Sequence, residues 1–224
     1  MTSRTVLVAY VIVGVLNVAL IPTDASVAFT VTKALLMPLL LAWLLLHTHG
    51  RLSPPLRLLA LGIVFAWAGD LLLEGDGDLF FVTGLLAFLA MQVCYIIAFT
   101  RVPGPGLVRA WKIALVPYVI AWLVLNILVS SGVGALRVPV LVYSIVLVTM
   151  AVAALDLVIR VPQDKGWRVA IGAALFVVSD GLIALTAFGP LSSSSLASIA
   201  IMTTYILAQG LITTGFTEAL APRP

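Results

Sequence analysis

Residues 27–46 read VAFTVTKALLMPLLLAWLLL, and this stretch decides the fold class. Its only charged side chain is Lys33. A helix of about 20 apolar residues spans the roughly 30 Å hydrocarbon core of a bilayer. A charge at the centre of such a helix costs about 2.5–3.5 kcal/mol on insertion scales. The stretch therefore predicts a membrane-spanning helix in which Lys33 has a specific role.

The rest of the chain has the same character, because 62% of its residues are hydrophobic and 9% are charged. Soluble domains carry about 45–50% apolar and about 25% charged residues. A soluble globule of this composition would expose large apolar patches, so lipid is the expected solvent. We expect an all-α polytopic membrane protein with a single integral membrane domain over residues 1–224. Its eight spans are predicted at residues 5–21, 27–46, 58–73, 79–100, 113–129, 138–159, 169–188 and 196–217.

The charges in the connections predict the orientation of these spans. All Lys and Arg residues except Lys33 and Arg137 precede the first span, follow the last, or lie in the second, fourth and sixth connections. Cytoplasmic loops carry the excess of Lys and Arg, so both termini are expected in the cytoplasm, in a bacterial-type inner membrane. The basic residues form no patch with aromatic ones, which argues against nucleic acid as a partner.

Ionisable residues inside the spans are the candidate functional residues, because they are costly in lipid. At 1.5 Å per residue, Asp70 lies ~18 Å and Asp180 ~16 Å from the cytoplasmic ends of their spans, and Lys33 lies ~21 Å from that face. The three residues share one predicted layer, slightly outside the midplane. Other polar residues of the spans lie in this layer or somewhat deeper toward the cytoplasm, namely Asn17, Asn126, Gln92, Tyr95, Tyr205 and Gln209.

Two interpretations of this layer stay open. In the first, Lys33 pairs with one aspartate and the cluster serves helix packing. In the second, two carboxyl groups meet in a pocket, where desolvation and repulsion keep one protonated and the other ionised. Phosphate-loop, zinc-helix and serine-elbow motifs are absent, so neither a cofactor nor a metal is expected. The lone Cys94 excludes a disulfide within the chain.

Several segments together carry a family resemblance. They are Thr32-Lys33-Ala34-Leu35-Leu36-Met37-Pro38-Leu39-Leu40, Gly69-Asp70-Leu71-Leu72-Leu73, Phe81-x-x-Gly84-Leu85-x-x-Phe88-Leu89 with Tyr95, Gly172-Ala173-x-x-Phe176-x-x-Ser179-Asp180, and Tyr205-x-x-Ala208-Gln209-x-Leu211-Ile212. In order and spacing the chain resembles the YhhN-like lysoplasmalogenase family of eight-span membrane proteins.

The chain departs from the pattern of that family at two positions. The family usually has Lys-Pro where this chain has Lys33-Ala34, and a histidine where this chain has Gln92. An amide can replace a histidine as a hydrogen-bonding group but not as a proton-transfer group. A catalytically inert family member is therefore one alternative.

The resemblance implies hydrolysis of the vinyl-ether bond of lysoplasmalogens to a fatty aldehyde and a glycerophospho-ethanolamine or -choline. It implies Asp70 and Asp180 as catalytic residues, and Lys33 as a residue that holds a carboxylate ionised or meets the phosphate. The remaining polar residues of the spans are candidates for substrate binding. The expected partners are a lysophospholipid or ether-lipid substrate and membrane lipids, and the oligomeric state is open. A small transporter that uses the buried Asp and Lys residues is the alternative from another class.

Overall fold

The computed structural model describes residues 2–220 of the chain, without the side chain of Arg109. These residues form helices and connections and no strand. Eight helices are long and apolar enough to cross a membrane, which confirms the predicted fold class. They are α1 (Ser3–Leu20), α2 (Ser26–His47), α3 (Pro54–Leu72), α4 (Asp78–Thr100), α6 (Val116–Val129), α7 (Arg137–Asp156), α8 (Gln163–Ala187) and α9 (Ser195–Leu220).

Short helices complete some of these spans. The 3-10 turn η1 (Lys112–Leu115) leads into α6, η2 (Gly134–Leu136) precedes α7, and η3 (Leu157–Ile159) follows it. The short helix α5 (Leu107–Ala110) lies in the connection after α4.

The observed helices extend beyond several of the predicted apolar runs. Helix α8 begins at Gln163, six residues before the predicted start of the seventh span, and α9 continues to Leu220. Helix α3 begins at Pro54 and carries proline in its first turn, where the missing N–H leaves no helical bond unmade. Backbone hydrogen bonding therefore continues into polar sequence until a turn signal stops it, whereas hydropathy marks only the part in hydrocarbon.

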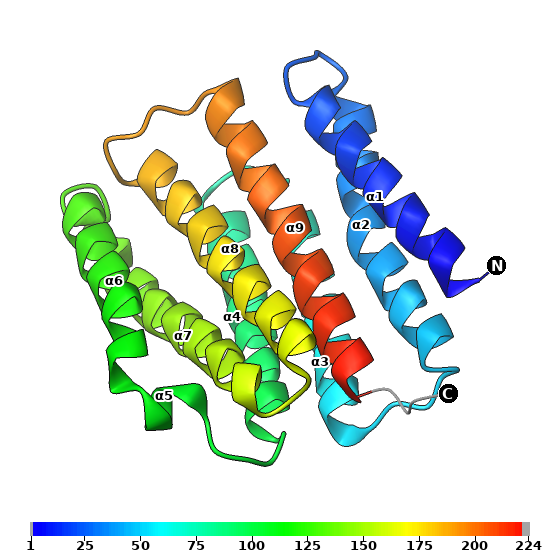
Figure 1. Cartoon of the computed structure of the whole chain (residues 1–224). Helices are drawn as coiled ribbons and strands as arrows, with labels where there is room; N and C mark the ends of the chain where they lie inside the picture. Colours follow the sequence, from blue (N-terminus) through cyan, green and yellow to red (C-terminus); the bar gives the residue numbers. More distant parts are fainter. Residues whose placement is uncertain (1, 221–224) are drawn as a thin grey trace. The chain divides into compact units, whose positions relative to one another are not determined.

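Residue contacts divide the chain into two compact units. Unit 1 contains residues 2–101 and 216–220, and unit 2 contains residues 102–215. In unit 1 the helices pack in chain order, with α1 against α2, α2 against α3 and α3 against α4; α1 and α2 run side by side at the blue end of the chain (Figure 1). In unit 2, α6, α7 and α8 contact one another.

A proline within α2 links that helix to α3. Pro38 has no N–H, so the carbonyl of Ala34, four residues earlier, loses its helical partner. The indole Nε1 of Trp67, on α3, donates to this oxygen at 2.9 Å. An unpaired carbonyl is expensive in lipid, where no water replaces the missing donor. The bond therefore satisfies the carbonyl and sets the register of α2 against α3.

Replacing Trp67 with phenylalanine is expected to destabilise unit 1 by about 1–2 kcal/mol, because the ring remains while the donor to Ala34 is lost. The lone Cys94 is buried and can report unfolding through its reaction with a thiol-specific dye during a thermal ramp. Trp167→Phe is the matched control, since this tryptophan is similarly exposed (43% against 38%) and has no hydrogen bond within residues 2–220. An equal effect of both substitutions would contradict the prediction.

Glycines let α3 and α4 approach closely. A Cβ on Gly62 would collide with the ring of Tyr95, and one on Gly69 would lie 2.8 Å from the ring of Phe88. These pairs align the two antiparallel helices, so Asp70 lies near the level of Phe88. Small residues at such contacts are typical of helix packing in membranes.

Candidate functional site

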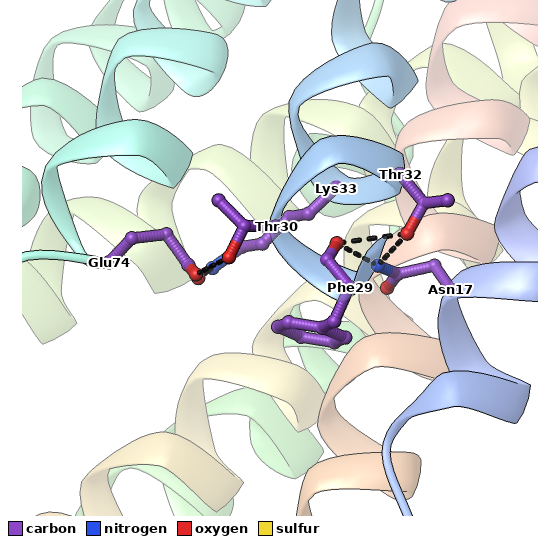
Figure 2. A network of polar contacts seen from close by, with 6 residues as sticks. All are labelled: Asn17, Phe29, Thr30, Thr32, Lys33 and Glu74. Atoms are coloured by element: carbon purple, nitrogen blue, oxygen red, sulfur yellow. Dashed lines mark hydrogen bonds and ion pairs between the residues drawn. The ribbon is translucent and has the colours of Figure 1, made fainter. Parts of the chain in front are cut away.

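The ammonium of Lys33, inside α2, pairs with a carboxylate that follows α3. Its Nζ donates to Oε1 of Glu74 at 2.7 Å, and Thr30 Oγ1 donates to Oε2 of the same group at 2.8 Å. Figure 2 shows Lys33 and Glu74 pointing toward each other beside Thr30. The side chains of Lys33 and Glu74 are 12% and 25% exposed. Lys33 therefore forms an ion pair, but its partner is Glu74 rather than the aspartate considered from the sequence.

Burial and the ion pair shift the pKa of Glu74, which lies just outside the span, in opposite directions. Burial raises the pKa of this carboxyl group, whereas the hydrogen bond and charge of Lys33, with the Thr30 hydroxyl, lower it. The net effect holds the pKa of Glu74 below its ordinary value. At pH values above the ordinary pKa of a glutamate side chain, the ion pair therefore stabilises the folded protein. This stabilisation is lost as the pH falls through the lowered pKa of Glu74.

Asp70 lies in the last turn of α3 and is 3% exposed. Trp67 and Glu74, three residues before it and four after it, both bond to α2. Helical residues three apart share one face, so Asp70 lies on the side of α3 from which Trp67 bonds to α2. The α2–α3 seam thus gathers Lys33, Asp70 and Glu74 in unit 1.

Two polar residues of α4 are completely buried in unit 1. Gln92 is 0% exposed, and neither its amide nitrogen nor its amide oxygen has a hydrogen-bond partner within residues 2–220. Tyr95 is also 0% exposed, with its ring against Gly62 and beside Phe99. A buried amide without partners costs about 1–3 kcal/mol. Such a cost is typical of positions that serve a ligand or a bound water.

Asp180 lies inside α8 in unit 2 and receives a hydrogen bond from another helix. The hydroxyl of Tyr143, on α7, donates to its Oδ2 at 2.5 Å. Asp180 is half-buried, and its Oδ1 has no hydrogen-bond partner among the residues that the structure describes. Tyr143 itself is 9% exposed. One carboxyl oxygen of Asp180 is thus held in place by the Tyr143 hydroxyl.

Glu74 and Tyr143 are not among the candidate residues predicted from the sequence. Glu74 follows the predicted third span, and no sequence pattern indicated its ion pair with Lys33. Tyr143 lies in the largely apolar sixth predicted span, where its hydroxyl and the neighbouring Ser144 are the local signals of a polar role.

Two candidates of α9 lie against α8 in unit 2. Tyr205 is 5% exposed and its ring lies 5.9 Å from that of Phe176. Gln209 is 0% exposed and follows Tyr205 by one helical turn, on the same side of α9. Helices α8 and α9 pack closely beside these residues, because a Cβ on Gly172 would lie 2.9 Å from the carbonyl oxygen of Ala208.

The two asparagines among the candidates join neighbouring helices. Asn17 Nδ2, on α1, donates to the Phe29 carbonyl at 3.0 Å and to Thr32 Oγ1 at 2.9 Å, on the side of α2 away from Glu74 (Figure 2). Asn126 Nδ2, on α6, donates to the Trp122 carbonyl at 2.8 Å and to Ser144 at 3.4 Å. Their donors are therefore already engaged in packing α1 on α2 and α6 on α7.

Asp70 belongs to unit 1 and Asp180 to unit 2, so each carboxyl group has a local environment of its own. Asp70 shares the α2–α3 seam with an ion pair, whereas Asp180 is held by a tyrosine. Both are carboxyl groups inside membrane-spanning helices, where ionisable residues are rare and usually functional.

These features define a multi-span α-helical membrane protein with ionisable residues within its spans. The chain belongs to the YhhN family, which it matches over residues 28–216. That segment includes every candidate residue except Asn17.

Curated relatives extend the comparison. The chain is similar to the bovine protein named lysoplasmalogenase TMEM86A, with 32% identity over 83% of this chain and 78% of the relative. It is 29% identical to the human protein of that name, over 89% of this chain and 83% of the relative. No solved structure matches the chain.

Proposed function

We propose that this protein is an intramembrane hydrolase that cleaves the vinyl-ether bond of lysoplasmalogens. The products are a fatty aldehyde and glycerophospho-ethanolamine or -choline. Membership of the YhhN family and relatives named lysoplasmalogenases support the substrate class. The carboxyl group of Asp180 carries the proposal, because one of its oxygens is held by Tyr143 and the other has no partner in the described part of the chain.

Vinyl-ether hydrolysis requires an acid and a polarised water. A proton adds to the β-carbon of the double bond and forms an oxocarbenium ion. Water then adds to the cationic carbon and loses a proton, and the resulting hemiacetal collapses to aldehyde and glycerol hydroxyl. The proton consumed in the first step is returned when water adds. Carboxyl groups can supply each of these transfers, and no nucleophilic serine is needed.

Asp70 and Asp180 are the two candidate catalytic residues, because a carboxyl group inside a span can donate the proton, stabilise the cation and orient water. Lys33 meets the substrate phosphate. The candidates for binding the polar part of the substrate are Gln92, whose amide is unpartnered within residues 2–220, and Tyr95 in unit 1, and Tyr205 and Gln209 in unit 2. Asn17 and Asn126 have a supporting role, because their amide groups hold α1 on α2 and α6 on α7.

The proposed enzyme works in a bacterial-type inner membrane with both termini in the cytoplasm. The distribution of Lys and Arg among the connections supports this orientation. A reporter enzyme that is active only in the cytoplasm should then be active when it is fused to the C-terminus.

The direct test is aldehyde release by the purified protein in detergent, measured with a coupled alcohol dehydrogenase and NADH. We expect turnover of a 1-alkenyl lysophospholipid without any gradient. A 1-alkyl lysophospholipid is the control, since it has the same shape but no double bond to protonate. A transporter would instead release no aldehyde, and it would move lipid between two compartments when the protein is placed in a membrane that separates them. Absence of both activities in folded protein would favour an inert family member.

A further inference from the structure

The Lys33–Glu74 pair lies where α2 begins and α3 ends. Lys33 comes seven residues after Ser26, the first residue of α2, which is about 10 Å along the axis. Glu74 follows Leu72, the last residue of α3. A long lysine side chain carries its ammonium toward the nearer membrane surface. The pair therefore lies at the level where acyl chains end and head groups begin.

Helix packing alone does not account for this ion pair. Apolar side chains of similar size often stabilise a protein as well as a buried ion pair does, and exposed pairs contribute little. The α2–α3 seam already has a bond of its own, from Trp67 to Ala34. Two opposite charges at this level therefore indicate a ligand that uses both.

Each charged group has unused capacity for a ligand. The ammonium of Lys33 has three donors, and its one hydrogen bond goes to Glu74. Both oxygens of Glu74 accept one bond each and have further lone pairs. Two exposed carboxylates follow Glu74 in the chain, Asp76 in the connection and Asp78 at the start of α4, so the Glu74 side of the pair favours cations.

We propose that Lys33 and Glu74 form a head-group subsite for zwitterionic lysophospholipids, in which Lys33 binds the phosphate and Glu74 binds the ammonium. This inference deepens the proposed function and rests on it for the substrate. A phosphoethanolamine group satisfies both charges at once. A phosphoglycerol group would satisfy Lys33 and leave the carboxylate without a cation, so Glu74 is the residue that selects the head group.

The test measures binding of 1-acyl lysophosphatidylethanolamine and 1-acyl lysophosphatidylglycerol, which lack the vinyl-ether bond and are not consumed. Binding is read by calorimetry on the full chain in detergent. We expect the wild-type protein to bind the ethanolamine lipid more tightly. Glu74→Gln should weaken that binding at least about tenfold, as expected for a lost charge-assisted bond, and leave phosphoglycerol binding unchanged. Asp24→Asn is the matched control, because it removes an exposed carboxylate from the α1–α2 connection and should change neither affinity.

The double exchange Lys33→Glu with Glu74→Lys separates binding from folding. It restores an ion pair of reversed polarity, so the protein should unfold at nearly the wild-type temperature in the Cys94 dye assay. Its affinity for the ethanolamine lipid should stay at least about tenfold below wild type, because each charge now faces the wrong end of the head group. Recovery of both stability and affinity would show that the pair is structural and would overturn the inference, as would an unchanged preference in Glu74→Gln. Absence of aldehyde release refutes the proposed function alone, because these binding measurements do not depend on turnover.

Discussion

Asparagine in place of Asp70 or of Asp180 is expected to lower kcat for aldehyde release at least about a hundredfold. Asparagine has nearly the same shape as aspartate but cannot transfer a proton, and general acid–base catalysis contributes about 10²–10⁴-fold. Binding of a non-cleavable lysolipid should change by a few-fold at most, because the head group and the acyl chain keep their contacts. Initial rates of the coupled aldehyde assay and calorimetry measure the two effects separately.

Two further variants control this experiment. Asp164→Asn removes an exposed carboxylate from the polar start of α8 and should leave kcat unchanged. Tyr143→Phe removes the hydroxyl that holds Oδ2 of Asp180, and it should lower kcat by about tenfold, as a hydrogen bond to a charged group predicts. Activity near wild type in either asparagine variant would remove that aspartate from the mechanism.

Gln92→Leu is expected to stabilise the protein and to impair it as an enzyme. The side chain is 0% exposed and neither amide atom has a partner within residues 2–220, so an apolar side chain of similar size removes the cost of burying a free amide. The expected gain is about 1–2 kcal/mol. If the amide binds substrate, kcat/KM should fall by about tenfold or more, since a ligand group loses its partner. The Cys94 dye assay and aldehyde release measure the two effects.

Met91→Leu is the matched control for stability. Met91 is the neighbouring residue of α4, also 0% exposed, and the exchange conserves volume without removing a polar group. Lower stability of Gln92→Leu would indicate that the amide has a partner, such as a bound water, in the folded protein. If the wild-type protein were inactive, activity gained by Gln92→His would instead favour the inert alternative raised by the family pattern.

Much of the fold could be predicted from the sequence, because the number of spans depends on local composition. Each run of about 20 apolar residues must bury its backbone polar groups in a helix, whatever its neighbours are. The ends of the helices were less predictable. Helix α8 begins six residues before its apolar run, since hydrogen bonding and not hydropathy decides where a helix starts.

The candidate site was predictable only in part. Asp70, Asp180 and Lys33 stood out because charges in a span are costly. Gln92 could be named, but its lack of partners could not be foreseen. The engaged donors of Asn17 and Asn126 likewise depend on which helix lies beside each residue.

The sequence by itself determined an eight-span helical membrane protein with ionisable residues in its spans, because lipid penalises every charge and every free backbone group locally. Only the tertiary structure decided the partners of those residues. It paired Lys33 with Glu74 across 41 positions of sequence and Asp180 with Tyr143 across 37. The physical reason is that a hydrogen bond depends on the distance between two atoms, and packing between helices sets that distance for residues far apart in the chain.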